Sequence, residues 1–216
     1  MRYLLLFSLI SVCCQLASQQ DPAAKEILDR VATKTKQYQS IQADFTLVVV
    51  DHKEDHKNTT IGSIIVKGDK YKVTSEGTTV LYDGKTLWTY VQDNNEVTIT
   101  EPDNQDDNFL SNPAKVFTWY NRDFKYQYRG ETSIDGKEMH EIDLFPKNLD
   151  QPYSRIKIFI TKNTEQLAII SSIGKNGIDY SIFLNNFISN KDFSDDIFTF
   201  DPSSHKKVTI VDMRGL

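Results

Sequence analysis

Two histidines are the first candidates for acid–base or metal chemistry in this sequence. His52 and His56 lie in DHKEDHK, four residues apart, which is the spacing that places two metal ligands on one face of a helix. The surrounding residues are charged and loop-forming rather than helical. The sequence therefore predicts a solvated loop here and no metal site.

Two carboxylate clusters are the next candidates. EPDNQDDN contains four acidic residues but lacks the glycine and the alternation of a calcium-binding loop, so we expect it to be a polar loop before a helix. The second cluster surrounds His140 in a predicted strand. Alternation puts His140 on the face of Ile142 and Leu144, which favours a structural histidine over a catalytic base.

Other catalytic signatures are missing from the sequence. Cys13 and Cys14 both lie in the apolar N-terminal segment, and GxSxG, HExxH, P-loop and GxGxxG motifs do not occur. The formal net charge of −5 provides no broad basic footprint for nucleic acid. The sequence predicts a binding protein rather than an enzyme, with no cofactor and no metal.

The N-terminal segment predicts export. Arg2 precedes the apolar run Tyr3–Val12, which has signal-peptide length and is too short to span a bilayer. We expect residues 1–18 to be a signal peptide and residues 19–216 to form one soluble domain. Lipidation of Cys13 or Cys14 is not expected, because a lipoprotein signal has a small residue before the cysteine, whereas Val12 precedes Cys13 and Cys13 precedes Cys14.

One helix is predicted ahead of the strands. Asp21 is suited to cap it and Pro22 to occupy its first position, so we expect an amphipathic helix over Pro22–Tyr38. Its apolar face comprises Ile27, Leu28, Val31 and Tyr38.

From Ser40 onward the hydrophobic period changes to two, as in ADFTLVVV, and turn signals recur at hairpin spacing. The clearest hairpin is LYDGKTLWTYVQDNNEVTIT, residues 81–100, with Trp88 and Tyr90 on one parity. A second, short helix is predicted over residues 109–120. About ten strands then imply a large antiparallel sheet that curls or covers its edges.

Several segments together resemble the LolA family of periplasmic carriers of outer-membrane lipoproteins. These segments are the leading helix followed by YQSIQADFTL, then DGKTLWTY, the helix after the acidic loop, and IFTFDPSSHKKVTIVDMR. The resemblance implies an incomplete barrel of about eleven antiparallel strands whose concave face is covered by helices. It also implies a monomeric carrier in the periplasm of a Gram-negative envelope. Such a carrier takes lipoprotein acyl chains from an inner-membrane transporter to an outer-membrane acceptor.

On this basis we expect an apolar hollow that holds the acyl chains and a helical lid that plugs it. The expected lining comprises Phe45, Leu47, Ile64, Trp88 and Tyr90. The expected lid residues are Phe109, Leu110, Val116 and Phe117. The alternative is that these side chains form a permanent core, because parity alone does not identify the hollow face.

One segment departs from the family pattern. An Arg-Pro pair in the third strand region, whose arginine helps to hold the lid, is replaced here by VKGDKYKV. Either Lys67 or Lys70 takes over that role, or the lid is held differently; a lysine lacks the planar fork of arginine. Two alternative functions stay open: a sensor of lipid or polypeptide that regulates an envelope partner, and an exported enzyme with dispersed catalytic residues.

Overall fold

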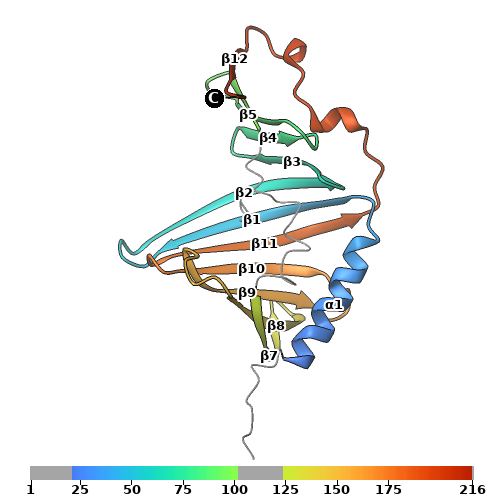
Figure 1. Cartoon of the computed structure of the whole chain (residues 1–216), viewed down its shortest axis with the longest axis vertical. Coiled ribbons are helices and arrows are strands. Elements are labelled where there is room, and N and C mark those ends of the chain that lie inside the picture. Colours follow the sequence, from blue (N-terminus) through green and yellow to red (C-terminus); the bar gives the residue numbers. More distant parts are fainter. Residues whose placement is uncertain (1–20, 102–123, 216) are drawn as a thin grey trace, which may run out of the picture.

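The computed structural model describes residues 21–101 and 124–215, which form one α-helix and a twelve-stranded sheet (Figure 1). The helix and strands are α1 (Pro22–Lys36), β1 (Ile41–Asp51), β2 (His56–Lys67), β3 (Lys70–Ser75), β4 (Thr78–Tyr82), β5 (Leu87–Val91), β6 (Glu96–Thr100), β7 (Phe124–Ile134), β8 (Lys137–Pro146), β9 (Tyr153–Thr161), β10 (Leu167–Gly174), β11 (Ile178–Ser189) and β12 (Thr209–Asp212). Two short 3-10 helices, η3 (Asp195–Phe198) and η4 (Pro202–Ser204), lie between β11 and β12.

The strand order in the sheet is β12-β6-β5-β4-β3-β2-β1-β11-β10-β9-β8-β7. Neighbours pair antiparallel except that β12 joins β6 in parallel, so the sheet stays open between β12 and β7. The prediction of a mainly β, incompletely closed architecture is confirmed. The sheet has one strand more than the resemblance implied, because the chain after β11 crosses to the far edge and adds β12. The predicted second helix lies outside the described residues.

Helix α1 begins as the sequence predicted. The Asp21 carboxylate accepts hydrogen bonds from the backbone N–H groups of Ala23 and Ala24, at 3.0 and 3.3 Å, and Pro22 occupies the first position. The helix ends at Lys36, two residues earlier than predicted. Tyr38 nevertheless packs against the core, where its ring lies 5.8 Å from that of Phe187.

Polar contacts hold α1 over the β7–β10 end of the sheet. Arg30 donates to Glu165 at 2.7 Å, and Lys34 donates to the Thr164 carbonyl at 2.7 Å, both beside the β9–β10 turn. The Asp21 carboxylate also accepts from the backbone N–H of Tyr128, at 2.9 Å, on edge strand β7. That contact satisfies a backbone donor at the open edge, where unpaired groups favour association with other strands.

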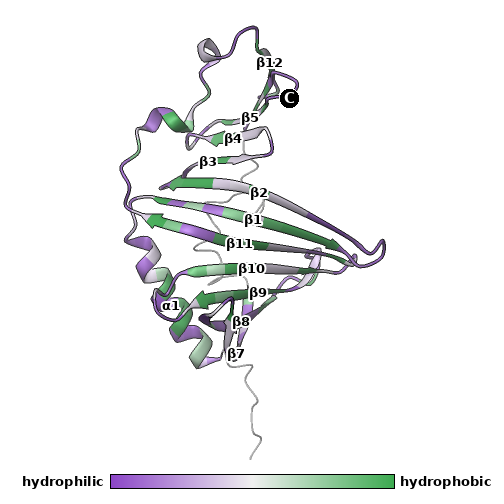
Figure 2. Cartoon of the chain, turned by 180° about the vertical axis from the view of Figure 1, so that it is seen from behind, coloured by the Kyte–Doolittle hydropathy of each residue, from purple (hydrophilic) through white to green (hydrophobic). Residues whose placement is uncertain are grey.

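The sheet face covered by α1 is called the inner face here, and the opposite one the outer face. The main core lies on the inner face, where α1 packs with strands β1–β3 and β7–β10. Figure 2 shows the long strands β1, β9, β10 and β11 as largely hydrophobic, and the β1–β2 hairpin tip as hydrophilic. This pattern agrees with a sheet that buries one face and keeps its projecting hairpin in water.

Candidate functional site

A row of apolar side chains continues across the inner face beyond the core, over strands β2 to β5. We call it the apolar strip; it consists of Ile64, Val66, Tyr71, Val73, Val80, Tyr82 and Leu87. Three of its members are buried, and they are Ile64, Val66 and Tyr71. The remaining four, towards β4 and β5, are only partly buried although they pack against the core. The strip therefore grades from core into accessible apolar surface.

Strand register places these side chains on one face. Ile64 lies opposite Val73, and Val73 lies opposite Val80. Tyr82, two residues along from Val80, lies opposite Leu87. Directly opposed residues in an antiparallel sheet project to the same side, so the strip is continuous across four strands.

The hydroxyl of Tyr71 lies in this apolar setting. Tyr71 is 2% exposed and its ring centroid is 5.3 Å from that of Tyr82. Burial raises the pKa of Tyr71 to about 12, because the phenolate would be poorly solvated there. Tyr71 therefore belongs to the buried part of the strip, with Ile64 and Val66.

The structure divides the predicted lining residues between the two faces. Phe45, Leu47 and Ile64 project from the inner face, where Phe45 and Ile64 are part of or packed against the core. Trp88 lies opposite Leu81, and Tyr90 opposite Val97, so both project from the outer face. The five residues do not line one surface.

Tyr90 packs with the chain that follows β11. Residues 190–208, called the C-terminal arm, connect β11 to β12 and run beside the β3–β6 part of the sheet (Figure 1), with η3 in contact with β3 and β4. Tyr90 has its ring centroid 5.3 Å from that of Phe200 and 4.6 Å from that of His205. Phe198 on the arm is fully buried. Tyr90 therefore belongs to a second, smaller core on the outer face.

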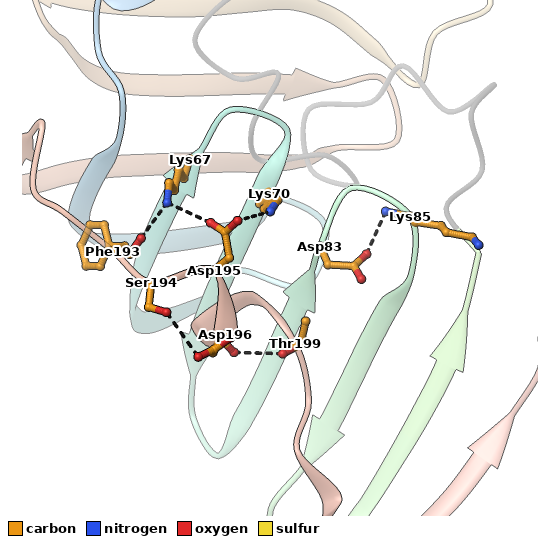
Figure 3. A network of polar contacts seen from close by, with 9 residues as sticks. All are labelled: Lys67, Lys70, Asp83, Lys85, Phe193, Ser194, Asp195, Asp196 and Thr199. Atoms are coloured by element: carbon orange, nitrogen blue, oxygen red, sulfur yellow. Dashed lines mark hydrogen bonds and ion pairs between the residues drawn. The ribbon is translucent and has the colours of Figure 1, made fainter.

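Lys67 and Lys70, the two lysines proposed to replace the family arginine, also face outward. Lys67 and Lys70 each form an ion pair with Asp195, at 2.8 and 2.7 Å, and Lys67 donates to the Phe193 carbonyl at 2.7 Å (Figure 3). Hydrogen bonds from the two lysines lower the pKa of Asp195 to about 2. Among the described residues, their partners belong to the C-terminal arm. The predicted lid residues Phe109, Leu110, Val116 and Phe117 lie outside the described residues.

The candidate acid–base residues have local partners. His52, in the β1–β2 turn, contacts Asp179 at 2.9 Å, and His140 shares a hydrogen bond of 2.9 Å with the Tyr128 hydroxyl. Burial lowers the pKa of His140. Asp143, 1% exposed, pairs with Arg129 at 2.7 Å and with Arg155 at 3.3 Å.

In the described ranges, no group of three or more histidine, cysteine, aspartate or glutamate residues is placed to hold a metal ion. Within those same ranges, no helix combines the length and apolar character needed to cross a membrane.

Sequence reasoning missed Val73, Val80 and Leu87, although the sequence carries a signal for them. Two-residue turns at 68–69 and 76–77 fix the register from β2 through β4. Both residues of the 76–77 turn have positive φ, +45° at Glu76 and +76° at Gly77, as tight hairpins require. Counting through these turns places Val73, Val80 and Tyr82 on the face of Ile64, and Leu87, not Trp88, shares that face because it lies opposite Tyr82.

Comparison with solved structures finds three similar chains, of which the first supports the fold. An uncharacterized conserved protein from Thermus thermophilus superposes with a TM-score of 0.58 at 14% identity, covering 88% of this chain and 99% of that one. The LolA superfamily protein NE2245 from Nitrosomonas europaea gives a TM-score of 0.44 at 13% identity, covering 82% and 98%. MucB in the Pseudomonas aeruginosa MucA/MucB complex gives 0.40 at 12%, covering 83% and 61%. A search by sequence among curated proteins found no match.

Comparison with family models gives a match over most of the chain. Residues 36–201 match the family described as outer membrane lipoprotein carrier protein LolA. The matched segment runs from the end of α1 to the middle of the C-terminal arm, and so includes strands β1–β11. The open sheet with its N-terminal helix agrees with this match, and the chain belongs to the LolA family.

Proposed function

We propose that this protein is a periplasmic carrier that binds the acyl chains of lipoproteins on the apolar strip and moves lipoproteins from the inner to the outer membrane. The observation that carries the proposal is the partial burial of Val73, Val80 and Leu87. They extend a hydrophobic core into accessible surface on the face that α1 covers elsewhere. Family membership supplies the chemical class of the ligand.

The energetics of such a carrier fit a partly buried surface. Each methylene taken out of water contributes about 0.8 kcal/mol, so bare acyl chains in the periplasm would be strongly unfavourable. A carrier also has to release them, which a fully enclosed core pocket would hinder. An open sheet with apolar side chains on one face can shield a hydrocarbon chain and still give it up at the next binding site.

The proposed route follows from this role. An inner-membrane lipoprotein-releasing transporter loads the strip, and an outer-membrane acceptor unloads it. Export requires the apolar segment at residues 1–18 to act as a signal peptide. Phe109, Leu110, Val116 and Phe117 are proposed as the apolar side chains that close over the empty strip.

Depletion of the protein in its host tests the carrier role. We expect lipoproteins to accumulate in the inner membrane, and the wild-type gene to restore their outer-membrane location. Val80→Asp should fail to restore it, because a carboxylate on the strip opposes hydrocarbon binding. Trp88→Asp, on the outer face, is the matched control for an added charge, provided that circular dichroism reports an intact fold for both variants.

Two outcomes would contradict the proposal. Normal lipoprotein location after depletion, with a changed envelope stress response, would favour a sensor that regulates an envelope partner. Full rescue by Val80→Asp would remove the strip from the function.

A further inference from the structure

A buried carboxylate on the outer face holds two arginines from different strands. Asp143 on β8 lies between Ile142 and Leu144 of the core, so its side chain projects from the outer face, yet it is only 1% exposed. Its Oδ2 atom accepts from Nε of Arg129 on β7 at 2.7 Å and from Nη1 of Arg155 on β9 at 3.3 Å. The two guanidinium groups therefore converge over β8, near the end of the sheet opposite to β12 (Figure 1).

This arrangement leaves positive charge and hydrogen-bond donors at the surface. A single arginine with its planar fork can satisfy both oxygens of a carboxylate. Here both arginines share Oδ2, whereas Oδ1 of Asp143 is buried without a hydrogen-bond partner among the described residues. Each guanidinium has several N–H donors, and towards the rest of the described chain each donates only one of them. Each side chain is 37% exposed, so a ligand can reach the pair from solvent.

A β-bulge provides Arg129. Tyr128 lies opposite Ile142 and Gly130 opposite Glu141, so Arg129 is the additional residue on β7. Gly130 has a φ of +112°, a backbone conformation that favours glycine. Apart from its chain neighbours, a Cβ atom built at Gly130 would meet no heavy atom of the described residues within 4 Å. The surface beside Arg129 is therefore open to an approaching ligand.

The neighbouring charges keep this patch positive. On the same face, Lys157 pairs with Glu141 at 2.8 Å, so these two charges offset one another. Lys125 on β7 lies opposite Phe145, two residues along β8 from Asp143, and so projects from the outer face too. It is exposed and has no ion-pair partner among the described residues. Two arginines against one aspartate leave a net charge of +1, and Lys125 raises it to +2, in a chain whose formal net charge is −5.

We propose that Arg129 and Arg155, oriented by Asp143, form a binding site for a phosphate group on the outer face. The planar guanidinium fork matches the oxygens of a phosphate, and the charge-assisted hydrogen bonds between them are strong. The buried carboxylate positions both arginines before the ligand arrives, which lowers the cost of ordering them on binding. The negative charge of a phosphate offsets the surplus positive charge of the patch. The site lies on the face opposite the apolar strip and does not depend on acyl binding.

Titration with inorganic phosphate tests the site itself. In the ¹⁵N-labelled mature protein, the Nε–H signals of Arg129 and Arg155 should shift with phosphate and not with chloride at the same ionic strength. Arg155→Gln should weaken phosphate binding by about tenfold, because it removes a charged hydrogen-bond donor. The shorter contact between Arg129 and Asp143 stays in place in this variant. Arg155→Lys keeps the charge without the planar fork, so its affinity should also stay below that of the wild type.

Arg214→Gln is the matched control. Arg214 is another exposed arginine paired with an aspartate, Asp212, at the β12 end of the sheet, so its substitution removes the same charge away from the site. This variant should bind phosphate as the wild type does, and thermal unfolding checks that each variant keeps its fold. Equal losses in Arg155→Gln and Arg214→Gln would show that only net charge matters and would overturn the site.

Vesicle binding distinguishes the two sources of a phosphate group, a lipid headgroup and a soluble compound. Vesicles of dioleoyl phosphatidylcholine, with and without dioleoyl phosphatidylglycerol, carry the same acyl chains, so binding through the apolar strip contributes equally to both. A preference for phosphatidylglycerol that Arg155→Gln abolishes identifies a lipid headgroup. A response to inorganic phosphate without that preference identifies a soluble phosphate compound and supports the site as well.

One combined result would overturn the proposal. If phosphate shifts neither arginine signal, and Arg155→Gln binds both kinds of vesicle as the wild type does, the outer face has no phosphate site. The acyl-carrier function would be unaffected by that result, because it concerns the other face of the sheet.

Discussion

The inner face of the sheet has two parts that use apolar side chains differently. Under α1, Ile142, Leu144 and Ile156 are fully buried, with 0% exposure, and the helix is tied down by ion pairs and hydrogen bonds. On the other side of β1, Val80 and Leu87 remain partly buried on the same face. The first part is a permanent core and the second is surface that a ligand can cover. A carrier of this fold can thus divide one sheet face between stability and binding.

The largest expected effect comes from a substitution in the covered part. Ile158 is 2% exposed among the strands beneath α1. Ile158→Ala should lower the free energy of unfolding by about 2–5 kcal/mol, because it leaves a cavity in a close-packed core. Val80→Ala, its counterpart on the strip, should cost about 1 kcal/mol or less, since the side chain is only partly buried. Urea denaturation measures both, and equal losses would contradict the division of the face.

The second effect depends on pH and concerns the boundary between the two parts. The folded-state pKa of Tyr71 is raised to about 12 from its ordinary value of 10.0, so the protonated tyrosine stabilises the fold. That contribution is fully present below pH 10 and is lost as the pH rises through about 12. The loss amounts to about 2–3 kcal/mol when converted at about 1.36 kcal/mol per pKa unit.

Tyr71→Phe provides the control for this titration. Stability of the wild type should fall between pH 10 and pH 12 more steeply than that of Tyr71→Phe, in denaturation curves recorded at each pH. Identical pH profiles for the two proteins would mean that Tyr71 is as accessible to solvent as the partly buried side chains on β4 and β5.

A smaller effect should follow from release of the C-terminal arm, which lies on the opposite face. Lys67→Met with Lys70→Met removes both ion pairs to Asp195, so limited proteolysis should cleave residues 190–208 faster than in the wild type. Lys85→Met is the matched control. Its hydrogen bond to Asp83 is donated by the backbone N–H, so the substitution removes a positive charge and leaves that bond in place. Acyl binding should be retained, since the arm lies on the outer face.

The same anchor should weaken in acid. The folded-state pKa of Asp195 is lowered to about 2, from its ordinary value of 3.8. The anchor therefore contributes fully above pH 3.8 and is lost as the pH falls through about 2. Pepsin digestion across this range should release the arm progressively in the wild type, while the double lysine variant should be cleaved readily throughout.

The smallest expected effect is on ligand binding by outer-face variants. Trp88→Ala should leave the affinity for a fluorescent fatty acid unchanged, because Trp88 lies opposite Leu81 on the outer face. An affinity loss as large as that of Val80→Asp would mean that Trp88 contacts the ligand and that the two faces have been assigned wrongly.

Local chemistry made much of this fold predictable from sequence. The cap at Asp21, the proline at position 22 and the change of period after Ser40 each act over a few residues, so the helix and most strands could be placed. The parallel strand β12 could not, because its pairing with β6 joins segments more than a hundred residues apart. Its sequence, TIVD, is as compatible with an antiparallel edge.

The candidate site was predicted less well, for a physical reason. Alternation separates the two faces within one strand, but the faces of neighbouring strands can be matched only through the turn lengths, which are short at 68–69 and 76–77 and longer before Leu87. Trp88 and Tyr90 were predicted to line the hollow because they are large and aromatic. Tyr90 packs against Phe200 of the arm, a contact that no local pattern indicates, and Trp88 projects from the same outer face.

Photo-crosslinking would locate the bound hydrocarbon on one face or the other. A fatty acid that carries a diazirine near its terminal methyl is bound to the mature protein, irradiated, and its attachment sites are mapped by mass spectrometry. We expect attachment on the inner face, at Phe45, Val73, Val80 and Leu87. Attachment concentrated at Trp88, Tyr90 and the C-terminal arm, with none on the apolar strip, would show that the binding face has been assigned wrongly.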